Sequence, residues 1–486
     1  MLEAYCWPLS VASGDGAQLR ISTDAGSVEM RVTRDGAEPD VMRADTVHAE
    51  QHRTPSDASE NGCRWPVALE IATDGWPSGY YSVAVTAGDE RADACFVIRP
   101  RPEDPAPILL VLATTTWNAY NDWGGPSLYT GGTRVSFDRP FAKGFLVKPE
   151  PVGRMMQTTP DREAMGYRNW ARPLGLSDWS GGAGWWNWER PFLRWAESSG
   201  YRVDVATSHD LEAHPEVLAD HRLSLHVGHD EYWSWGMRDA LDAHVAAGGN
   251  TAIFSGNTCF WQIRFEDDGR AMTCFKYRAG AEDPVVGTPD ERFLSGIWSD
   301  RRVGRPETST IGLTFTRGGY SRYGLGAPRA SGGYTVARPD HWTFEGTGLR
   351  VGETFGERDV IVAYEVDGCA FTIRDGLPVP THEDGGPETL AILATAPARL
   401  WSQEEQPTRY AHEPGELEHV AAALFGEASP EHVEQVADNH AVMGMFTHPA
   451  GGIVFNTGVI DWTFGLKHGD PVVERITRNV LQRLSA

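Results

Sequence analysis

Ile108-Leu109-Leu110-Val111-Leu112-Ala113 is an unbroken apolar run. A strand that is buried on both faces has this composition, and such strands are typical of parallel sheets. Similar runs recur at Leu223–Val227, Thr251–Phe254 and Ile453–Phe455. We therefore expect these runs to be buried strands of one central sheet.

Helical patterns separate the apolar runs. The candidates are Pro191–Ser198, Ser234–Ala247 and Pro471–Leu484, and a glycine pair ends the second of them. This alternation of strands and helices is typical of βαβ units. It predicts an α/β fold with a mostly parallel, doubly wound sheet.

The segments around this core have a different composition. Residues 1–100 contain short alternating strand candidates separated by Gly/Asp turns, which predict a small N-terminal β-sandwich domain. Residues 101–107 are a proline-rich linker, because proline cannot donate to a strand ladder. Residues 108–486 then form the α/β domain, in which the stretch from about 265 to 401 is predicted to be a β-rich insertion with pieces such as Val360–Glu365.

Charge and composition limit the classes of partner and compartment. A net charge of −24 over 486 residues disfavours nucleic acid and anionic membranes. No apolar run reaches the roughly 18 residues of a membrane span, and the segment Met1–Ala4 has no signal-peptide character. The six cysteines are scattered without zinc spacing. These features predict a cytoplasmic protein with free thiols.

Polar side chains gather where two of the apolar runs end. Thr114–Gly125 is dense in amides, hydroxyls and aromatic rings, with Asn118–Asp122 at its centre. Gly228–Ser234 places an imidazole, two carboxylates and a phenol in His229–Tyr232. Ligands of open parallel sheets bind outside the carboxyl ends of the strands, so we expect substrate binding at the first segment and catalysis or metal binding at the second. The alternatives are a loop that satisfies its own backbone and a helix cap.

Two further strand ends carry weaker signals. Ser255–Trp261 is a glycine-flanked turn of the kind that can present a nucleophile, so Cys259 is a candidate with His229 as its base. A cysteine beside two aromatic residues also suits a buried core. Asn456 and Asp461 follow the last apolar run, and they either line the same crevice or cap the local turn.

Several of these segments together resemble the large-subunit family of N,N-dimethylformamidase. They are Gly75–Tyr81, Trp117–Gly125, Trp188–Pro191, Gly228–Trp233, Ser255–Thr258 and Phe455–Trp462. The resemblance implies a β-sandwich-like domain beside an α/β domain like that of the class I glutamine amidotransferases. It also implies hydrolysis of a small amide to formate and an amine.

The resemblance further implies a mononuclear iron held by two tyrosines and one glutamate. Phenolate and carboxylate are hard oxygen donors that suit iron, and the metal would polarise an amide oxygen and acidify a water. Tyr232 matches one of the two tyrosines. The other falls near Trp188–Pro191, where relatives often have tyrosine and this chain has Arg190. Tyr120, Tyr167 and Glu189 are the substitutes for it.

The glutamate ligand is expected from the insertion. Glu291 is the first choice and Glu282 the second. Glu231 is either the acid–base group or the partner that orients His229.

These features predict a metal-dependent hydrolase of C–N bonds in small amides. The predicted catalytic residues are His229, Glu231, Asn118 and Tyr120, and the predicted metal ligands are Tyr232 and Glu291. One alternative is a metal-free hydrolase that uses Cys259 and His229. Another is a non-catalytic protein that binds a carbohydrate or a small hydrophobic ligand through some of its 18 tryptophans. A homo-oligomer is compatible with the sequence, and a small partner subunit is not assumed because the chain is shorter than the family's large subunit.

Overall fold

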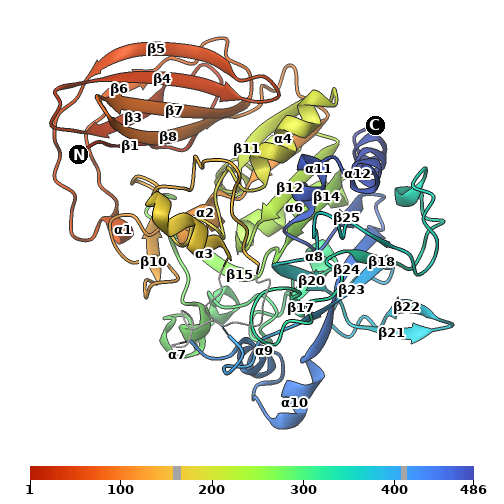
Figure 1. Cartoon of the computed structure of the whole chain (residues 1–486). Helices are drawn as coiled ribbons and strands as arrows, with labels where there is room; N and C mark the ends of the chain where they lie inside the picture. Colours follow the sequence, from red (N-terminus) through yellow and green to blue (C-terminus); the bar gives the residue numbers. More distant parts are fainter. Residues whose placement is uncertain (157–165, 407–412) are drawn as a thin grey trace. The chain divides into compact units, whose positions relative to one another are not determined.

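The computed structural model describes residues 1–156, 166–406 and 413–486, and these form two compact units. Unit 1 consists of Met1–Val152, Ala171–His221 and Arg264–Cys274. Unit 2 consists of Gly153–Trp170, Arg222–Ile263 and Phe275–Ala486. Figure 1 shows the elements of both units. The division of the sequence at residues 100 and 108 stays a prediction.

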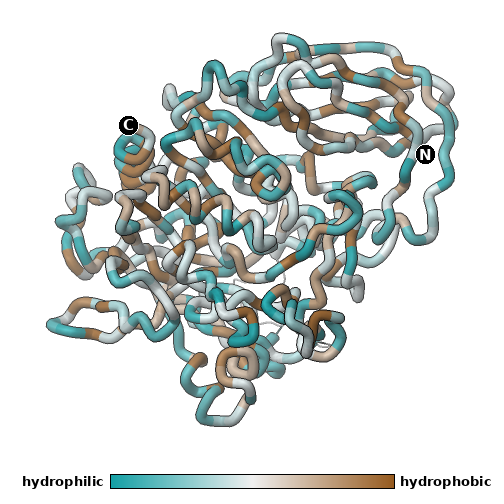
Figure 2. Tube along the Cα trace, turned by 180° about the vertical axis from the view of Figure 1, so that it is seen from behind, coloured by the Kyte–Doolittle hydropathy of each residue, from teal (hydrophilic) through white to brown (hydrophobic). Residues whose placement is uncertain are grey.

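The N-terminal part of unit 1 is built from two sheets that share one core (Figure 1). The first sheet contains β1 (Glu3–Cys6), β3 (Ala17–Ser22) and β6 (Leu69–Ile71), and the second contains β2 (Ser10–Val11), β8 (Glu90–Ile98), β7 (Gly79–Ala87), β4 (Ser27–Asp35) and β5 (Asp40–His48). Leu19 of the first sheet and Val83 of the second belong to the same buried cluster. Strand β4 alternates between exposed and buried residues over most of its length, and Figure 2 shows alternating hydropathy along these strands. One face of each strand is therefore buried against the other sheet.

The remainder of unit 1 contains the apolar run that begins at Ile108. It forms β9 (Ile108–Leu112), which is fully buried and pairs in parallel with β11 (Val203–Thr207). Helix α2 (Thr114–Tyr120) follows β9 directly, so the polar residues after the strand lie on a helix. The other elements of unit 1 are α1 (Ala58–Asn61), β10 (Arg134–Ser136), η1 (Arg172–Leu174), α4 (Glu189–Ser198), α5 (Ser208–Ala213), η2 (Pro215–Leu218) and β16 (Ala271–Thr273).

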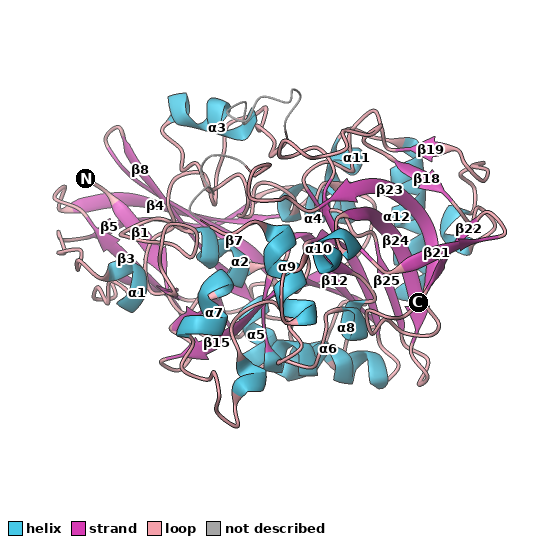
Figure 3. Cartoon of the chain, turned by 90° about the horizontal axis from the view of Figure 1, so that it is seen from below, coloured by secondary structure: helices cyan, strands magenta, loops and turns pink. Residues whose placement is uncertain are grey.

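Unit 2 contains a mixed sheet. Its strands, in spatial order, are β12 (Leu223–His229), β14 (Asn250–Gly256), β25 (Ile453–Asn456), β24 (Asp438–Thr447), β23 (Ala391–Arg399), β17 (Thr314–Tyr320) and β20 (Glu365–Gly368). The pairs β12–β14 and β14–β25 are parallel. From β25 onward every pairing is antiparallel, and Figure 3 shows β23, β24 and β25 as neighbouring strands.

The predicted fold class is wrong. The protein is rich in β structure arranged in several sheets, rather than a mostly parallel, doubly wound sheet enclosed by helices, and the class I glutamine-amidotransferase-like assignment falls with it. The chain turns back between Thr447 and Ile453, and a connection this short can join only antiparallel strands. The stretch predicted to be an insertion supplies β17, β20 and β23 to the same sheet as β25.

Helices pack against the parallel end of this sheet. Helices α6 (Trp235–Ala246) and α12 (Pro471–Leu484) both contact β14. Ser234 caps α6 by accepting a hydrogen bond from the Met237 N–H. Two elements begin in unit 2 and end in unit 1, namely α3 (Gly166–Ala171) and β15 (Trp261–Glu266). The other elements of unit 2 are β13 (Tyr232–Ser234), η3 (Lys276–Arg278), α7 (Ala279–Glu282), η4 (Glu291–Phe293), α8 (Thr308–Ile311), β18 (Tyr334–Val336), η5 (Trp342–Phe344), β19 (Thr354–Phe355), β21 (Phe371–Arg374), β22 (Leu377–Pro380), α9 (Glu416–Phe425), α10 (Pro430–Gln435) and α11 (Trp462–Lys467). Among the described residues, no helix has the length and apolar character needed to cross a bilayer.

Candidate functional site

Two strand ends of unit 2 and the segment between β12 and β13 meet at His229. His229 is the last residue of β12, and Glu365 is the first residue of β20. The imidazole Nε2 lies 2.9 Å from Glu365 Oε2 and 3.3 Å from Glu231 Oε2. All three side chains are buried. The structure therefore brings the predicted pair His229 and Glu231 together and adds Glu365 to it.

Each of the two carboxylates is held by a further donor. The indole Nε1 of Trp261 donates to Glu231 Oε1 over 2.7 Å. The amide Nδ2 of Asn257 donates to Glu365 Oε2 over 3.1 Å. Buried carboxylates need such partners, because an unsatisfied charge is costly in a low-dielectric interior. We call His229, Glu231 and Glu365 the histidine–carboxylate cluster.

The end of β14 has special backbone geometry beside this cluster. A Cβ atom on Gly256 would lie 2.7 Å from the Glu365 carbonyl oxygen and 2.7 Å from the Ile460 N–H nitrogen. Asn257 and Cys259 adopt positive φ angles of 49° and 57°. Left-handed conformations of non-glycine residues are strained, and such strain gathers at functional sites. Gly256 thus permits the close backbone approach that places Glu365.

Aromatic rings connect the cluster to a third buried acid, Glu416. Tyr364 meets the His229 ring edge to face, with centroids 6.1 Å apart, and Tyr320 lies 6.1 Å from Tyr364. The hydroxyl groups of Tyr320 and Tyr277 donate to Glu416 Oε1 over 2.8 and 3.3 Å. Burial, together with the nearby Glu365 carboxylate, raises the pKa of Glu416 to about 8. Glu416 therefore carries a proton at neutral pH.

Asp367 of β20 is another carboxyl that burial keeps protonated. It is fully buried, and its Oδ2 accepts a hydrogen bond from the Thr258 N–H over 3.1 Å. Burial raises its pKa to about 8. This hydrogen bond ties β20 to the turn after β14.

The predicted metal ligands lie in different environments. Tyr232 begins β13, is fully buried and pairs with Trp261 of β15. Glu291 begins the one-turn helix η4 and is partly exposed, and Glu282 is exposed and pairs with Arg278. In the described part of the chain, no group of three or more His, Cys, Asp and Glu residues could hold a metal ion. The set of tyrosine and glutamate ligands stays a prediction.

Asn118 and Tyr120, predicted to position the substrate, belong to α2 of unit 1. Both are 1% exposed. Asn118 Oδ1 accepts a hydrogen bond from Arg139 Nη2 over 3.3 Å, while its buried Nδ2 donates to no group in residues 1–156, 166–406 and 413–486. The Tyr120 ring packs on Tyr129 with centroids 4.0 Å apart. Their role toward substrate stays a prediction.

Arg190, which replaces an expected tyrosine, is held in unit 1 by an ion pair and by a contact with an aromatic ring. Its Nε lies 2.6 Å from Asp35 Oδ2, and its guanidinium group stacks on Trp186 at 3.7 Å from the ring centroid. The neighbouring Glu189 accepts a hydrogen bond from the Ala113 N–H at the end of β9, over 2.9 Å. Tyr167, the other substitute that the sequence suggests, is buried in unit 2 against Trp170.

The remaining candidates at strand ends have local partners. Cys259 is fully buried, and burial raises the pKa of its thiol well above its usual range. Asn456 accepts a hydrogen bond from the Gly458 N–H over 2.7 Å, which satisfies the turn after β25. Asp461 pairs with Arg154 over 2.9 Å.

Glu365 is the site residue that sequence reasoning missed. It is the last residue of the predicted β-like piece Val360–Glu365 and the only one of them that lies in a strand, since β20 begins at Glu365. Its partner lies on β12, distant in sequence. An acid at the start of a strand in a predicted insertion is a weak signal. The two strands are not neighbours in the sheet, and only the packing of β20 beside the end of β14 brings Glu365 to His229.

Comparison with known proteins assigns the chain to a family. The family model described as N,N-dimethylformamidase beta subunit-like, C-terminal, matches residues 25–475. The N,N-dimethylformamidase beta subunit of Paracoccus aminophilus is 26% identical over 445 residues, which cover 86% of this chain and 54% of the relative. The beta subunit of the same name from an Alcaligenes species is 28% identical over 214 residues, which cover 41% of this chain and 28% of the relative. The chain thus spans about half the length of the Paracoccus relative. This protein belongs to the N,N-dimethylformamidase beta subunit-like family.

Proposed function

We propose that this protein hydrolyses the C–N bond of a small amide, with the histidine–carboxylate cluster as its acid–base centre. The observation that carries the proposal is the contact of His229 Nε2 with two buried carboxylates, at 2.9 and 3.3 Å. The names of the relatives support the reaction class, since both are called N,N-dimethylformamidase. An N,N-dialkylformamide is therefore the first substrate to test.

Amide hydrolysis requires proton transfers that this cluster is suited to perform. Water adds to the amide carbon, the C–N bond breaks, and the amine leaves after its nitrogen gains a proton. His229 takes the proton from the attacking water and delivers it to the leaving nitrogen. Glu231 and Glu365 hold the imidazole in place and balance its charge while it carries that proton. Trp261 and Asn257 fix the two carboxylates during the transfer.

A cysteine nucleophile is the rival mechanism, and the environment of Cys259 disfavours it. The attacking species would be the thiolate, and burial raises the pKa of this thiol. The backbone N–H of Cys259 donates to the Asp230 carbonyl oxygen over 2.8 Å, and this hydrogen bond fixes the backbone after β14. Cys259 is thus better explained as part of the core beneath the cluster.

Iron bound through Tyr232 is a separate proposal. A buried phenol is a suitable hard donor for such an ion. A second tyrosine and a glutamate would complete this site, as the family resemblance implies, and the bound metal would polarise the amide oxygen. Elemental analysis of protein produced in iron-replete cells tests this proposal, and a sample without transition metal would contradict it.

The reaction is tested by incubating purified protein with a panel of formamides and acetamides. Release of amine and carboxylate is measured for the wild type, His229→Gln and Cys259→Ala, with His432→Gln on helix α10 as the matched control. We expect turnover by the wild type, Cys259→Ala and His432→Gln, and a loss of at least about 100-fold in His229→Gln. Full activity of His229→Gln would refute the acid–base role. Loss of activity in Cys259→Ala, with folding intact, would favour the cysteine mechanism.

A further inference from the structure

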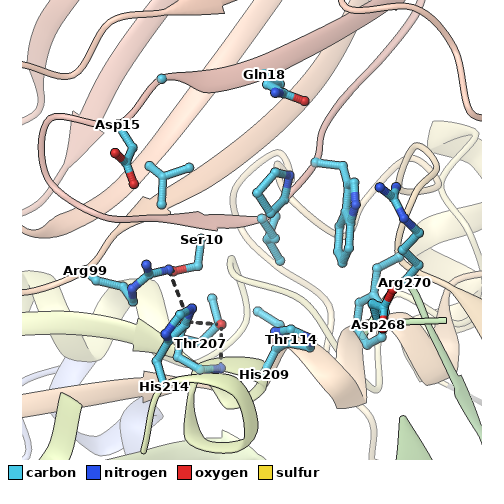
Figure 4. A pocket seen from close by; sticks show the side chains of 17 residues that line it. Ser10, Asp15, Gln18, Arg99, Thr114, Thr207, His209, His214, Asp268 and Arg270 are labelled. Atoms are coloured by element: carbon cyan, nitrogen blue, oxygen red, sulfur yellow. Dashed lines mark hydrogen bonds and ion pairs between the residues drawn. The ribbon is translucent and has the colours of Figure 1, made fainter. Parts of the chain in front are cut away.

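Unit 1 contains a cavity of about 450 Å³ (Figure 4). Small-molecule sites generally lie between roughly 300 and 1,000 Å³, so the cavity can accept a compact organic ligand. Its walls come from separate parts of unit 1: the segment around β2, the residues that follow β9 and β11, and the hairpin before β16. Thr114 and Thr207 mark the carboxyl ends of that parallel pair, which is the usual edge for ligand binding.

A fixed cation lies at one side of the cavity. Arg99 Nη1 donates to Ser10 Oγ over 3.1 Å and to Asp210 Oδ1 over 3.3 Å. The other oxygen of Asp210 accepts hydrogen bonds from the N–H and hydroxyl groups of Thr207, over 2.8 and 2.7 Å. This chain of contacts sets the direction of the guanidinium group. Arg99 Nε and Nη2 donate to no group in the described chain, and the side chain is 15% exposed. Two donors of an oriented guanidinium group therefore remain for a ligand.

Rings line another wall of the cavity. Trp7 and Phe137 stack with centroids 6.0 Å apart and an interplanar angle of 22°. His209 meets both rings edge-on, at 6.2 and 6.0 Å. Burial lowers the pKa of His209, so its imidazole is neutral at neutral pH. Gly269, at φ +80°, leaves room for this ring, since a Cβ there would lie 2.2 Å from His209 Nε2. An uncharged aromatic wall favours a flat apolar group.

The charged side chains around the cavity indicate how many negative charges its ligand carries. Arg270 lies on the opposite side of the cavity from Arg99 in Figure 4, and it is half exposed and pairs with Asp138 over 3.3 Å. Asp15 and Asp268 also line the cavity and are exposed. Each arginine is already partly neutralised and two further acids stand nearby, so a monoanion fits this field better than a dianion such as a phosphate ester.

We propose that this cavity binds a small aromatic monocarboxylate, whose carboxylate contacts Arg99 and whose ring packs on Trp7, Phe137 and His209. The proposal does not depend on amide hydrolysis, since it concerns residues of unit 1 alone.

Calorimetric titration of the full chain with benzoate, and with its neutral isostere benzamide, tests the site. We expect saturable binding of benzoate that is at least about tenfold tighter than that of benzamide. Arg99→Gln should lower benzoate affinity by at least about tenfold, whereas Arg43→Gln, which removes another arginine of the same unit from its pair with Asp45, should leave it unchanged. Absence of saturable binding, or equal affinity in the wild type and Arg99→Gln, would overturn the proposal.

A second measurement covers the possibility that Arg99→Gln does not fold. Wild-type protein is photolabelled with 4-azidobenzoate in competition with benzoate, and the labelled peptides are identified by mass spectrometry. Labels that benzoate suppresses should fall on the peptides that contain Trp7, Phe137 and His209. Suppressible labels confined to other peptides would overturn the assignment of the cavity.

Discussion

Glu416, the first residue of α9, is a buried carboxyl whose replacement by glutamine tests the electrostatics of unit 2. Burial raises its pKa from 4.5 to about 8, with the Glu365 carboxylate adding to the effect and the hydrogen bond from Tyr320 opposing it. The unfolded chain therefore releases this proton near pH 4.5, while the folded protein keeps it up to about pH 8.

Proton linkage gives the sign and the size of the effect on stability. Between the two pKa values the folded state holds one proton more than the unfolded state, so the free energy of unfolding falls by about 1.4 kcal/mol per pH unit as pH rises. The loss across the whole window is at most about 5 kcal/mol. Glu416→Gln has no proton to lose, and its amide oxygen still accepts the hydrogen bond from Tyr320. We expect the variant to be more stable than the wild type above the folded-state pKa, and the two to converge below pH 4.5.

Urea unfolding followed by tryptophan fluorescence, at a series of pH values from about 5 to 9, measures this difference. Glu434→Gln on α10 removes an exposed carboxylate and serves as the control, which should follow the wild type. If the wild type and Glu416→Gln lose stability in parallel over this range, Glu416 is already ionised in the folded protein and the reasoning is wrong.

Three further predictions concern the neighbourhood of the cluster, unit 1 and the metal. Gly256→Ala places a Cβ atom 2.7 Å from the Glu365 carbonyl oxygen, so it should destabilise the protein by about 2 kcal/mol or more and reduce amide turnover. Thermal unfolding and product release measure the two effects, and wild-type values for both would contradict the proposed placement of Glu365. Arg190→Ala leaves the buried Asp35 carboxylate without its 2.6 Å partner and should cost about 3 kcal/mol in urea unfolding, and a change below about 0.5 kcal/mol would remove its structural role. Tyr232→Phe should abolish any iron that the wild type retains on purification, and equal iron in both proteins would exclude Tyr232 as a ligand.

Local sequence patterns predicted many elements of the fold. The apolar run at Ile108 is β9, and Leu223–Val227 lies within β12. The apolar spacing of Ser234–Ala247 and Pro471–Leu484 corresponds to α6 and α12. These segments could be predicted because burial and helical periodicity leave a pattern in consecutive residues.

The arrangement of the strands in the sheet could not be predicted from such local patterns. Ile453–Phe455 is apolar because β25 is buried, but the same composition suits a strand with a parallel neighbour on one side and an antiparallel neighbour on the other. The strands β17, β20 and β23 lie among glycine and proline residues, so their membership of the large sheet depends on pairings between distant segments. The fold class was therefore wrong although many of its elements were right.

The candidate site shows the same limit. His229 and Glu231 stood out because their functional groups are adjacent in the sequence. Glu365 could not be identified from the sequence, because its contact with His229 is created by the packing of β20 beside the end of β14. The close backbone contact at Gly256, where a Cβ atom would lie 2.7 Å from the Glu365 carbonyl oxygen, is recognisable only after the fold is known.

The most direct test of the acid–base assignment is the kcat/KM of Glu365→Gln on the best substrate of the amide panel. This change keeps the size of the side chain and removes the carboxylate that lies 2.9 Å from His229 Nε2. If the histidine–carboxylate cluster moves the protons of amide hydrolysis, kcat/KM should fall by about 100-fold or more, with thermal stability retained. A folded Glu365→Gln enzyme with wild-type kcat/KM would contradict the account.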